Sequence, residues 1–532
     1  MRSLARWVVR LVAIFLGLVG LHLPLLGLPY YWDEAGYYIP AALDFFHSGL
    51  LIPQSTLTTG HTPLVPVYLA TAWRLFGYSP VVTRVAMLLL AAATVTALYA
   101  LARLVANREV AIWSALLLAL SPVFFAQSSL AHLDLTAGLF TTLAVLAALE
   151  IGPVARASRP WTGTTRMAVL RRFHGAGPTF ALTASLAVLS KETAVVLLPV
   201  VWAFAWFRRK ERQAVAWVWL VFPLLPLLAW AVYYHHVTGY WTGNREYLDY
   251  NLYSALHPIR IFLSLLRRLY QFFIGGFNWL LVAGAMLGIW GRRKRGDVFA
   301  PQENHEQQSS RDFVFLTVGL TALYILMLSV VGGAILRRYF LPVFPLFFLA
   351  AVALIFQLPK RVARSIVCAT TFCLVGSWFI NPPYPFPFED NLAYADFARL
   401  HQQTAAYLES LPGNPRILTA WPASDELARP FLGYVRRPLH VVAVSGFKPE
   451  EFREVSADSF DLLYLYSRKW EPAHNLLNRI PFLERLQSRY FDYAPQARDD
   501  WLAAQYGLRL LQQFERRGQW VRVYAKQGKP QN

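Results

Sequence analysis

The sequence is poor in charged residues and in cysteine. Only 15% of its 532 residues are Asp, Glu, Lys or Arg, whereas 56% are hydrophobic, and a soluble domain carries about 25% charged residues. A chain of this composition cannot enclose so much apolar surface in one water-soluble core. The two cysteines, Cys368 and Cys373, lie in one apolar run, so they imply no disulfide framework.

Acidic residues are scarcer than basic ones, and the formal net charge is +19. The basic residues fall in short clusters between apolar runs, which is the pattern of cytoplasmic loops in membrane proteins and not of a nucleic-acid-binding surface. We therefore expect no nucleic-acid partner. The apolar runs, typically about 18 residues or more, can cross a bilayer. We predict eleven spans, at residues 11–29, 81–102, 110–126, 135–151, 177–190, 194–207, 214–234, 271–290, 313–331, 340–358 and 365–380.

The basic residues also indicate how the chain is oriented. The first run resembles a signal peptide, but it lacks a clear small-residue cleavage site and leads into further spans, so we interpret it as a retained helix. A cytoplasmic N-terminus puts most loop arginines and lysines inside. The sequence thus predicts a multi-pass protein of the plasma (inner) membrane with a periplasmic C-terminal domain. The predicted inner-loop residues are Arg103, Arg108, Arg156, Arg159, Arg166, Arg171, Arg172, Arg208, Arg209, Lys210, Arg212, Arg292, Arg293, Lys294, Arg295, Arg311, Lys360, Arg361 and Arg364.

Residues 381–532 differ from the rest, because the long apolar runs stop and the charge density rises. A proline-rich linker begins at Asn381. An amphipathic helix is expected at 393–410, and strand-like runs lie at 416–420, 440–444 and 462–466. We predict a transmembrane domain over 1–380 and an extracytoplasmic α/β domain over 381–532 that has no phosphate-cradling glycine loop.

Ionisable residues gather in the predicted outer loops, next to the ends of the spans. Charges so close to a membrane are costly and are functional candidates by default. Asp33 and Glu34 follow the first span directly, and paired carboxylates there suit acid–base chemistry and cation binding. An amphipathic stretch over 37–50, expected to lie in the plane of the membrane interface, comes next. The remaining candidates are His61, His132, Asp134, Lys191, Glu192, Arg337, Arg338 and Tyr339.

Each candidate also has a purely structural interpretation. Asp33 and Glu34 can be solvated residues at a helix end, and Asp134 can be a helix N-cap. The arginines of the outer loops can reach lipid headgroups, which is the interpretation that we favour for 260, 267 and 268. Lys191 and Glu192 can form a local ion pair in a tight turn.

Five short motifs, in this order and all on the predicted outer face, resemble those of the bacterial GT-C glycosyltransferases of the protein O-mannosyltransferase and lipid A aminoarabinose transferase superfamily. The resemblance covers roughly residues 1–380 and the presence of an outer C-terminal domain. One departure is that Thr62 replaces the first proline of the family's re-entry motif, where His61 stands at a position that is lysine in some members. The motifs are Trp32-Asp33-Glu34, His61-Thr-Pro-Leu, Gln127-Ser-Ser through Asp134, Ser190-Lys191-Glu192 and Arg338-Tyr-Phe-Leu-Pro.

The resemblance implies an inverting sugar transferase that uses a polyprenyl-phosphate-linked donor. Such a donor can be presented at the outer leaflet, whereas nucleotide sugars are cytoplasmic. The acceptor would be an envelope glycan, lipid or protein. In this interpretation Asp33 is the general base, and Glu34 supports it or binds a divalent cation together with His61. The expected substrate-binding residues are His61, His132, Asp134, Lys191, Arg337, Arg338 and Tyr339.

Two other classes of protein compete with a transferase. A transporter or lipid flippase concentrates polar residues near mid-membrane and often has internal repeats, whereas these charges lie at the outer boundary and we find no repeat. A non-enzymatic scaffold for envelope assembly would leave the charges of the five outer loops without a purpose.

Overall fold

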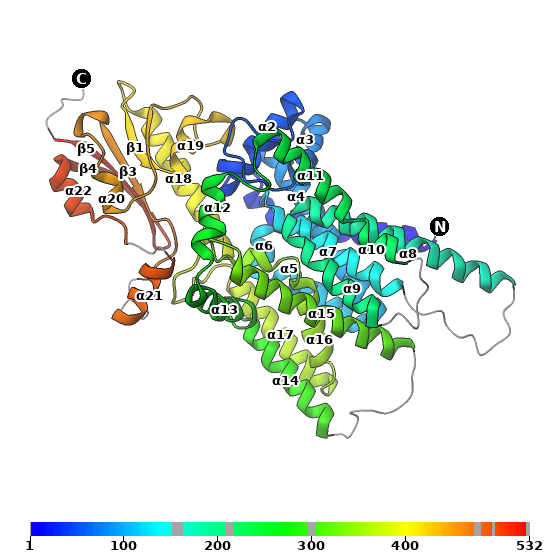
Figure 1. Ribbon diagram of the computed structural model, residues 1–532. Helices are drawn as coiled ribbons and strands as arrows, with labels where there is room; N and C mark the ends of the chain where they lie inside the picture. Colours follow the sequence, from blue (N-terminus) through cyan, green and yellow to red (C-terminus); the bar gives the residue numbers. More distant parts are fainter. Residues whose placement is uncertain are drawn as a thin grey trace.

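The computed structural model describes residues 2–151, 163–207, 216–294, 305–472, 480–491 and 495–527. Its helices form a long bundle with a small sheet at one end (Figure 1). The helices of the bundle are α1 Arg2–His22, α2 Ile39–Ser48, α3 Leu64–Phe76, α4 Pro80–Val105, α5 Arg108–Leu120, α6 Pro122–Gln127, α7 Leu133–Glu150, α8 Gly163–Ser190, α9 Leu197–Phe207, α10 Ala216–Val221, α11 Leu224–Thr238, α12 Arg245–Asn251, α13 Pro258–Phe273, α14 Asn278–Lys294, α15 His305–Val330, α16 Phe344–Ile355 and α17 Lys360–Gly376.

Each predicted span overlaps a helix of the bundle, but the count of eleven stays a prediction. Among the described residues, five helices are long and apolar enough to cross a membrane, and a sixth span results if the bent pair α13–α14 counts as one. The predicted span 271–290 runs across this bend of 78°, because its first residues belong to α13. The predicted interfacial stretch 37–50 contains the short helix α2.

Local signals define where several of these helices begin. The Ser79 hydroxyl accepts a hydrogen bond from the backbone N–H of Val82 at 3.2 Å, and Pro80 occupies the first turn of α4. The side chain of Asn107 caps α5 in the same way, accepting from the N–H groups of residues 109 and 110. Such caps satisfy the backbone donors that a helix start leaves free. A sharp turn therefore separates the end of α4 from the start of α5.

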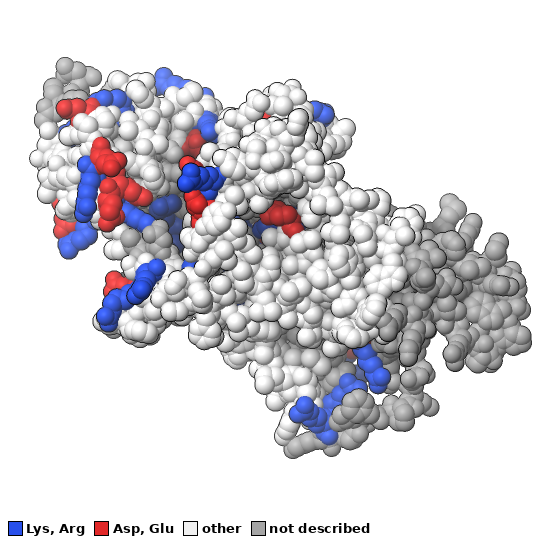
Figure 2. All heavy atoms as spheres, viewed as in Figure 1, with Lys and Arg blue, Asp and Glu red and all other residues white. Residues whose placement is uncertain are grey.

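The ends of the bundle differ in charge. The N-terminus lies at the end opposite the sheet (Figure 1). In Figure 2 most of the bundle surface is free of charge; basic side chains gather around the tip of α14, which carries Arg292 and Arg293, and an acidic group is visible on the bundle nearer the sheet. This distribution agrees with a cytoplasmic far end. Seven of the predicted inner-loop residues lie outside the described residues: Arg156, Arg159, Arg208, Arg209, Lys210, Arg212 and Arg295.

The predicted orientation can be tested with reporter fusions. We expect a reporter fused after Arg293 to lie in the cytoplasm and one fused at the C-terminus to lie in the periplasm, because loop arginines are retained inside. Paired phosphatase and fluorescent-protein fusions would measure this. Two cytoplasmic signals would contradict the orientation, and with it the outer position of the candidate site.

The sheet lies in the C-terminal region, and its strand order is β2-β1-β3-β5-β4. Strands β1, β2 and β3 are parallel, whereas β5 runs antiparallel to β3 and to β4. This confirms the helix predicted at 393–410 and the three predicted strands; the β4–β5 hairpin was not predicted. The bounds are β1 Ile417–Ala420, β2 Val441–Val444, β3 Leu462–Tyr466, β4 Leu508–Arg516, β5 Gln519–Lys526, α18 Ala393–Ser410, α19 Ala423–Ala428, α20 Pro449–Phe452, α21 Pro481–Phe491 and α22 Asp499–Tyr506.

The C-terminal region packs directly on the loop that follows α1. The hydroxyl of Tyr434 donates to the backbone carbonyl of Tyr30 at 3.1 Å. The rings of Trp32 and Trp421 meet edge to face, with their centroids 5.4 Å apart. Gly36 lies so close that a Cβ there would stand 2.6 Å from the indole nitrogen of Trp421. The sheet domain therefore covers the segment that carries the first pair of candidate carboxylates.

Candidate active site

Asp33 stands at the start of a π-helical turn, η2, over Glu34–Tyr38. Turns of this kind are rare and frequently occur at functional sites. The side chain of Asp33 is 20% exposed, and its Oδ2 accepts a hydrogen bond from the guanidinium of Arg338. Asp33 is thus a carboxylate that is held by a buried cation and still reaches solvent.

Glu34, its neighbour, is fully buried and faces the other way. Its Oε1 accepts from Arg84 and from the backbone N–H of Ala131 at 2.6 Å. Its Oε2 accepts from Arg84 at 2.9 Å and from the N–H of Tyr31 at 2.8 Å. Because these four bonds occupy both oxygens, Glu34 joins the first loop to α4 and to the turn before α7.

Arg338 connects the acidic residues of the site. It lies in η7, a 3₁₀ turn over Arg337–Phe340, and its side chain is only 2% exposed. Besides Asp33, it contacts Glu389 Oε2 at 3.2 Å, Asp134 Oδ2 at 3.7 Å and His132 Nδ1 at 2.7 Å. Buried charges are normally paired and hydrogen-bonded, so this one guanidinium determines how the three carboxyl groups lie.

A second cation, Lys191, lies on the other side of Asp134. Its Nζ is 2.7 Å from Asp134 Oδ1 and 4.1 Å from the centroid of the Tyr339 ring. Asp134 lies in the first turn of α7 and does not cap it; the residue at the cap position is His132. Glu192, the next residue, pairs with His61 instead, whose Nδ1 is 3.0 Å from both carboxylate oxygens.

Burial and nearby charges shift the pKa of several of these groups. Burial raises the pKa of Glu389 to about 8, even though Arg338 opposes this shift. Burial also holds the pKa of His132 well below its usual range, and Arg338 lowers it further, so the imidazole is neutral. Burial would raise the pKa of Glu192, but the charges of His61 and Lys191 together lower it to about 2. The site therefore combines an ionised carboxylate, Glu192, with a carboxylic acid, Glu389, that keeps its proton at neutral pH.

The raised pKa of Glu389 makes the stability of the protein depend on pH. Between the ordinary pKa of 4.5 and about 8, the folded state binds more protons than the unfolded state, so stability falls as pH rises. Glu389→Gln should remove this fall while keeping the neutral shape of the side chain. Thermal unfolding between about pH 5 and about pH 8 would measure it, with the exposed Glu454→Gln as control. If the thermal stability of wild type and of Glu389→Gln depended on pH in the same way, the raised pKa of Glu389 would be contradicted.

The structure brings most of the predicted residues together. Asp33, Asp134 and Lys191 form one connected cluster with Arg338, and the ring of Tyr339 lies against Lys191. The imidazole of His61 stands beside this cluster, with its ring centroid 6.4 Å from that of Tyr38. A small cavity of about 30 Å³ adjoins His61, between the first outer loop and α11.

Arg337 is an exception, since the expectation that it binds substrate beside Arg338 does not agree with its position. Its Nε and Nη2 donate to the backbone carbonyls of Gln271 and Gly275, at 3.3 and 2.9 Å, on the far side of η7. Successive residues of a 3₁₀ turn point about 120° apart. Two adjacent arginines therefore cannot serve the same side of the turn.

The divalent cation predicted at Glu34 and His61 does not fit these residues either. Both carboxylate oxygens of Glu34 accept hydrogen bonds from Arg84 and the backbone, and the imidazole of His61 is hydrogen-bonded to Glu192. In the part of the chain that the structure describes, no group of three or more His, Cys, Asp or Glu is placed to hold a metal ion. We assign no chemical step to a metal.

Two residues of the site escaped the sequence interpretation. Arg84 is an arginine within a predicted span, and an ionisable residue at such a position is itself a signal of function. Glu389 lies in the linker after the last predicted span, where the sequence interpretation named no candidate. Only its contact with Arg338 makes it part of the site.

Comparisons with known proteins bear on the fold. No protein-family model matches the sequence, and no curated protein matches it. The structure of ArnT from Cupriavidus metallidurans bound to undecaprenyl phosphate is similar, with a TM-score of 0.54, 14% identity and coverage of 97% of this chain and 98% of that one. The apo state of ArnT has a TM-score of 0.52 at 14% identity and 98% coverage of both chains.

The structure of an oligosaccharyltransferase from Archaeoglobus fulgidus in complex with Zn and sulfate is less similar, with a TM-score of 0.45, 12% identity and coverage of 85% and 67%. The two ArnT structures show that this chain shares their fold, in line with the resemblance found in the sequence. Over nearly its full length the chain has the fold of ArnT, a lipid A aminoarabinose transferase.

Proposed function

We propose that this protein is a membrane glycosyltransferase that moves a sugar from a polyprenyl-phosphate donor to an envelope glycan, lipid or protein. The observation that carries this proposal is the partly exposed Asp33 at the end of the bundle. It pairs with the buried Arg338, and a second buried cation, Lys191, pairs with Asp134 on the other side of Arg338. The shared fold with ArnT, one structure of which holds undecaprenyl phosphate, supports a donor of this class. We propose that the site faces the periplasm.

We propose a single displacement at the anomeric carbon, as the family resemblance implies. Asp33 takes the proton from an acceptor hydroxyl while the acceptor oxygen bonds to the anomeric carbon. The bond from that carbon to the phosphate oxygen breaks, and the lipid phosphate leaves as an anion. Lys191, with Arg338 behind it, stabilises the negative charge that develops on the phosphate. One displacement inverts the configuration, in line with the family resemblance.

The remaining residues hold this arrangement. We assign Glu34 and Arg84 as a positioning pair, because their bonds tie the Asp33 loop to α4. His61 and Glu192 form the next hydrogen-bonded pair along the site and would contact the donor. Neutral His132 and the protonated Glu389 also contact the guanidinium of Arg338. These contacts hold the guanidinium in place during the reaction.

The nature of the donor is the first point to test. Purified protein should transfer sugar from a polyprenyl-phosphate donor and not from a nucleotide sugar. Lys191→Gln should weaken donor binding by about tenfold or more, since a hydrogen bond to a charged group is worth about 1.5–3 kcal/mol. Arg245→Gln, an exposed cation of the outer loop, should bind donor like the wild type. Efficient transfer from a nucleotide sugar without lipid would overturn the proposal.

A further inference from the structure

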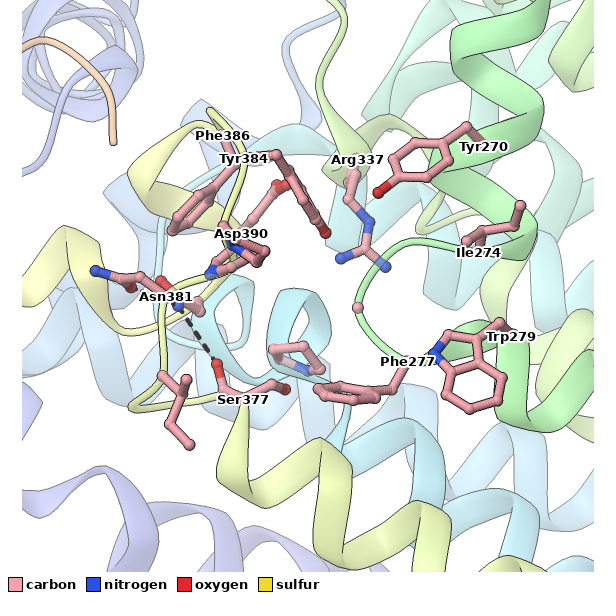
Figure 3. Close-up of a pocket in the computed structure, with 16 residues that line it drawn as sticks. Tyr270, Ile274, Phe277, Trp279, Arg337, Ser377, Asn381, Tyr384, Phe386 and Asp390 are labelled. Carbon is pink, nitrogen blue, oxygen red and sulfur yellow. Dashed lines mark hydrogen bonds between the residues drawn. The ribbon is translucent and has the colours of Figure 1, made fainter. Parts of the chain in front are cut away.

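A second cavity lies on the opposite side of η7 from Asp33. It has a volume of about 330 Å³, which is within the usual size range of small-ligand pockets. Its walls come from the bend between α13 and α14, the end of α17 and the linker that follows it (Figure 3). We call it the lateral cavity. It adjoins the catalytic cluster but contains none of the residues that we assign to the reaction.

Arg337 forms one polar wall of the lateral cavity. It is only 8% exposed, yet among the described residues no carboxyl oxygen lies within ion-pair distance of it, whereas Arg338 has three carboxyl groups around it. Two backbone carbonyls are its hydrogen-bond acceptors. The chain packs closely there, since a Cβ on Gly276, with φ +56°, would stand 2.3 Å from Nη1 of Arg337. A buried guanidinium without an anionic partner is costly, so this wall is complementary to an anion.

Asp390 forms a second polar wall. It is 6% exposed, and its Oδ1 has no hydrogen-bond partner among the described residues. Burial raises the pKa of this carboxyl to about 6, with Arg337 and Arg338 opposing the shift. An anion bound beside it would raise this pKa further, so the carboxyl group would meet the anion in its protonated form and donate a hydrogen bond to it. Figure 3 shows that Tyr270 and Tyr384 turn their hydroxyls toward Arg337.

The rim of the lateral cavity is apolar and faces outward. Trp279 is 48% exposed, Phe277 is 37% exposed and Ile380 is 70% exposed. Phe277 and Trp279 stand at the start of α14 and Ile380 stands just past the end of α17, at the boundary between the bundle and the C-terminal region. Exposed apolar groups at such a boundary contact lipid chains. The occupant should therefore have an anionic end and an apolar end.

We propose that the lateral cavity binds the phosphate headgroup of an anionic membrane lipid, with its acyl chains leaving the cavity past Phe277 and Ile380. The headgroup phosphate accepts hydrogen bonds from Arg337. This site is separate from the proposed donor site and does not depend on the proposed reaction. It adjoins that reaction because Arg337 and Asp390 are the sequence neighbours of Arg338 and Glu389, which face the catalytic cluster.

Site-specific photo-crosslinking in bilayer nanodiscs tests this proposal. A photoreactive residue replaces Phe277 in the rim or, as control, Phe372, an 82% exposed residue of α17. The probes are labelled phosphatidylglycerol and phosphatidylcholine. At Phe277 we expect phosphatidylglycerol to be captured about tenfold more efficiently, because both lipids carry the phosphate but only phosphatidylcholine also places a quaternary ammonium beside the buried cation of Arg337. At Phe372 we expect the two lipids to be captured alike. Equal capture at both positions would overturn the proposal.

Variants separate the role of Arg337 from a general effect on folding. Arg337→Gln should abolish the preference at Phe277, Arg337→Lys should keep part of it, and Arg293→Gln should leave it unchanged. Each variant is compared with the wild type for its elution volume and thermal midpoint. A preference that survives Arg337→Gln would overturn the proposal, as would its elimination by inorganic phosphate at the concentration of the lipid. Failure of sugar transfer in the wild type would instead count against the proposed function alone.

Discussion

Replacing Asp33 with asparagine should lower the rate of sugar transfer by about 10²–10⁴-fold, the usual contribution of general acid–base catalysis. Asparagine keeps the size of the side chain and can still accept a hydrogen bond from Arg338, but it cannot take up the acceptor proton. Donor binding and folding should therefore change little. Transfer rate and donor affinity should be measured in the same preparation.

Asp249→Asn is a matched control, because Asp249 is a 60% exposed carboxylate of an outer loop that pairs weakly with Arg245 at 4.0 Å. It should transfer sugar at the wild-type rate. Near-wild-type turnover of Asp33→Asn would remove the base assignment from Asp33, and Asp134 would become the next candidate. A loss of donor binding as large as the loss of rate would instead indicate a binding role for Asp33.

Arg84→Met should destabilise the protein by about 3–5 kcal/mol, because it leaves the charge of Glu34 buried without its partner. The pair is 1% and 0% exposed, so water cannot compensate. The double variant Glu34→Gln/Arg84→Met removes both charges and should regain most of the stability. Thermal or denaturant unfolding in detergent would measure all three proteins.

Arg103→Met serves as the control, since Arg103 is an exposed residue at the other end of α4. The same set of variants distinguishes a positioning role of Glu34 from a catalytic one. A positioning role predicts that activity recovers with stability in the double variant. If the double variant were stable but inactive by about 10²-fold or more, Glu34 would be part of the chemistry, as the sequence interpretation first had it.

The sequence identified the elements whose signals are local. Apolar runs of sufficient length mark the helices of the bundle, and β1 and β3, buried along their whole length, read as strands because they are short and apolar. It missed β4 and β5, which join the sheet through antiparallel pairing. Most of β4 is at least partly exposed, so its hydrophobic pattern is weak, and pairing with β5 compensates for this only in the folded chain.

The candidate site shows the same division. The sequence placed Asp33, Asp134, Lys191 and Arg338 at one end of the bundle, because each follows or precedes an apolar run and the runs alternate in direction. It could not show that Arg338 is the common partner of Asp33 and Glu389, whose positions are 305 and 51 residues away from it. Contacts over such separations follow from the packing of helices and not from any local pattern.

By itself, the amino-acid sequence determined that the chain is a multi-helix protein with an α/β region at its end, because length, hydropathy and charge act through neighbouring residues. Which way each polar side chain faces was decided only by the tertiary structure. Arg337 and Arg338 are adjacent and identical, yet one lies in the lateral cavity and the other in the catalytic cluster. The physical reason is that η7 turns sharply between two packed surfaces. Because burying an unpaired guanidinium is costly, each one hydrogen-bonds to the partners within its reach.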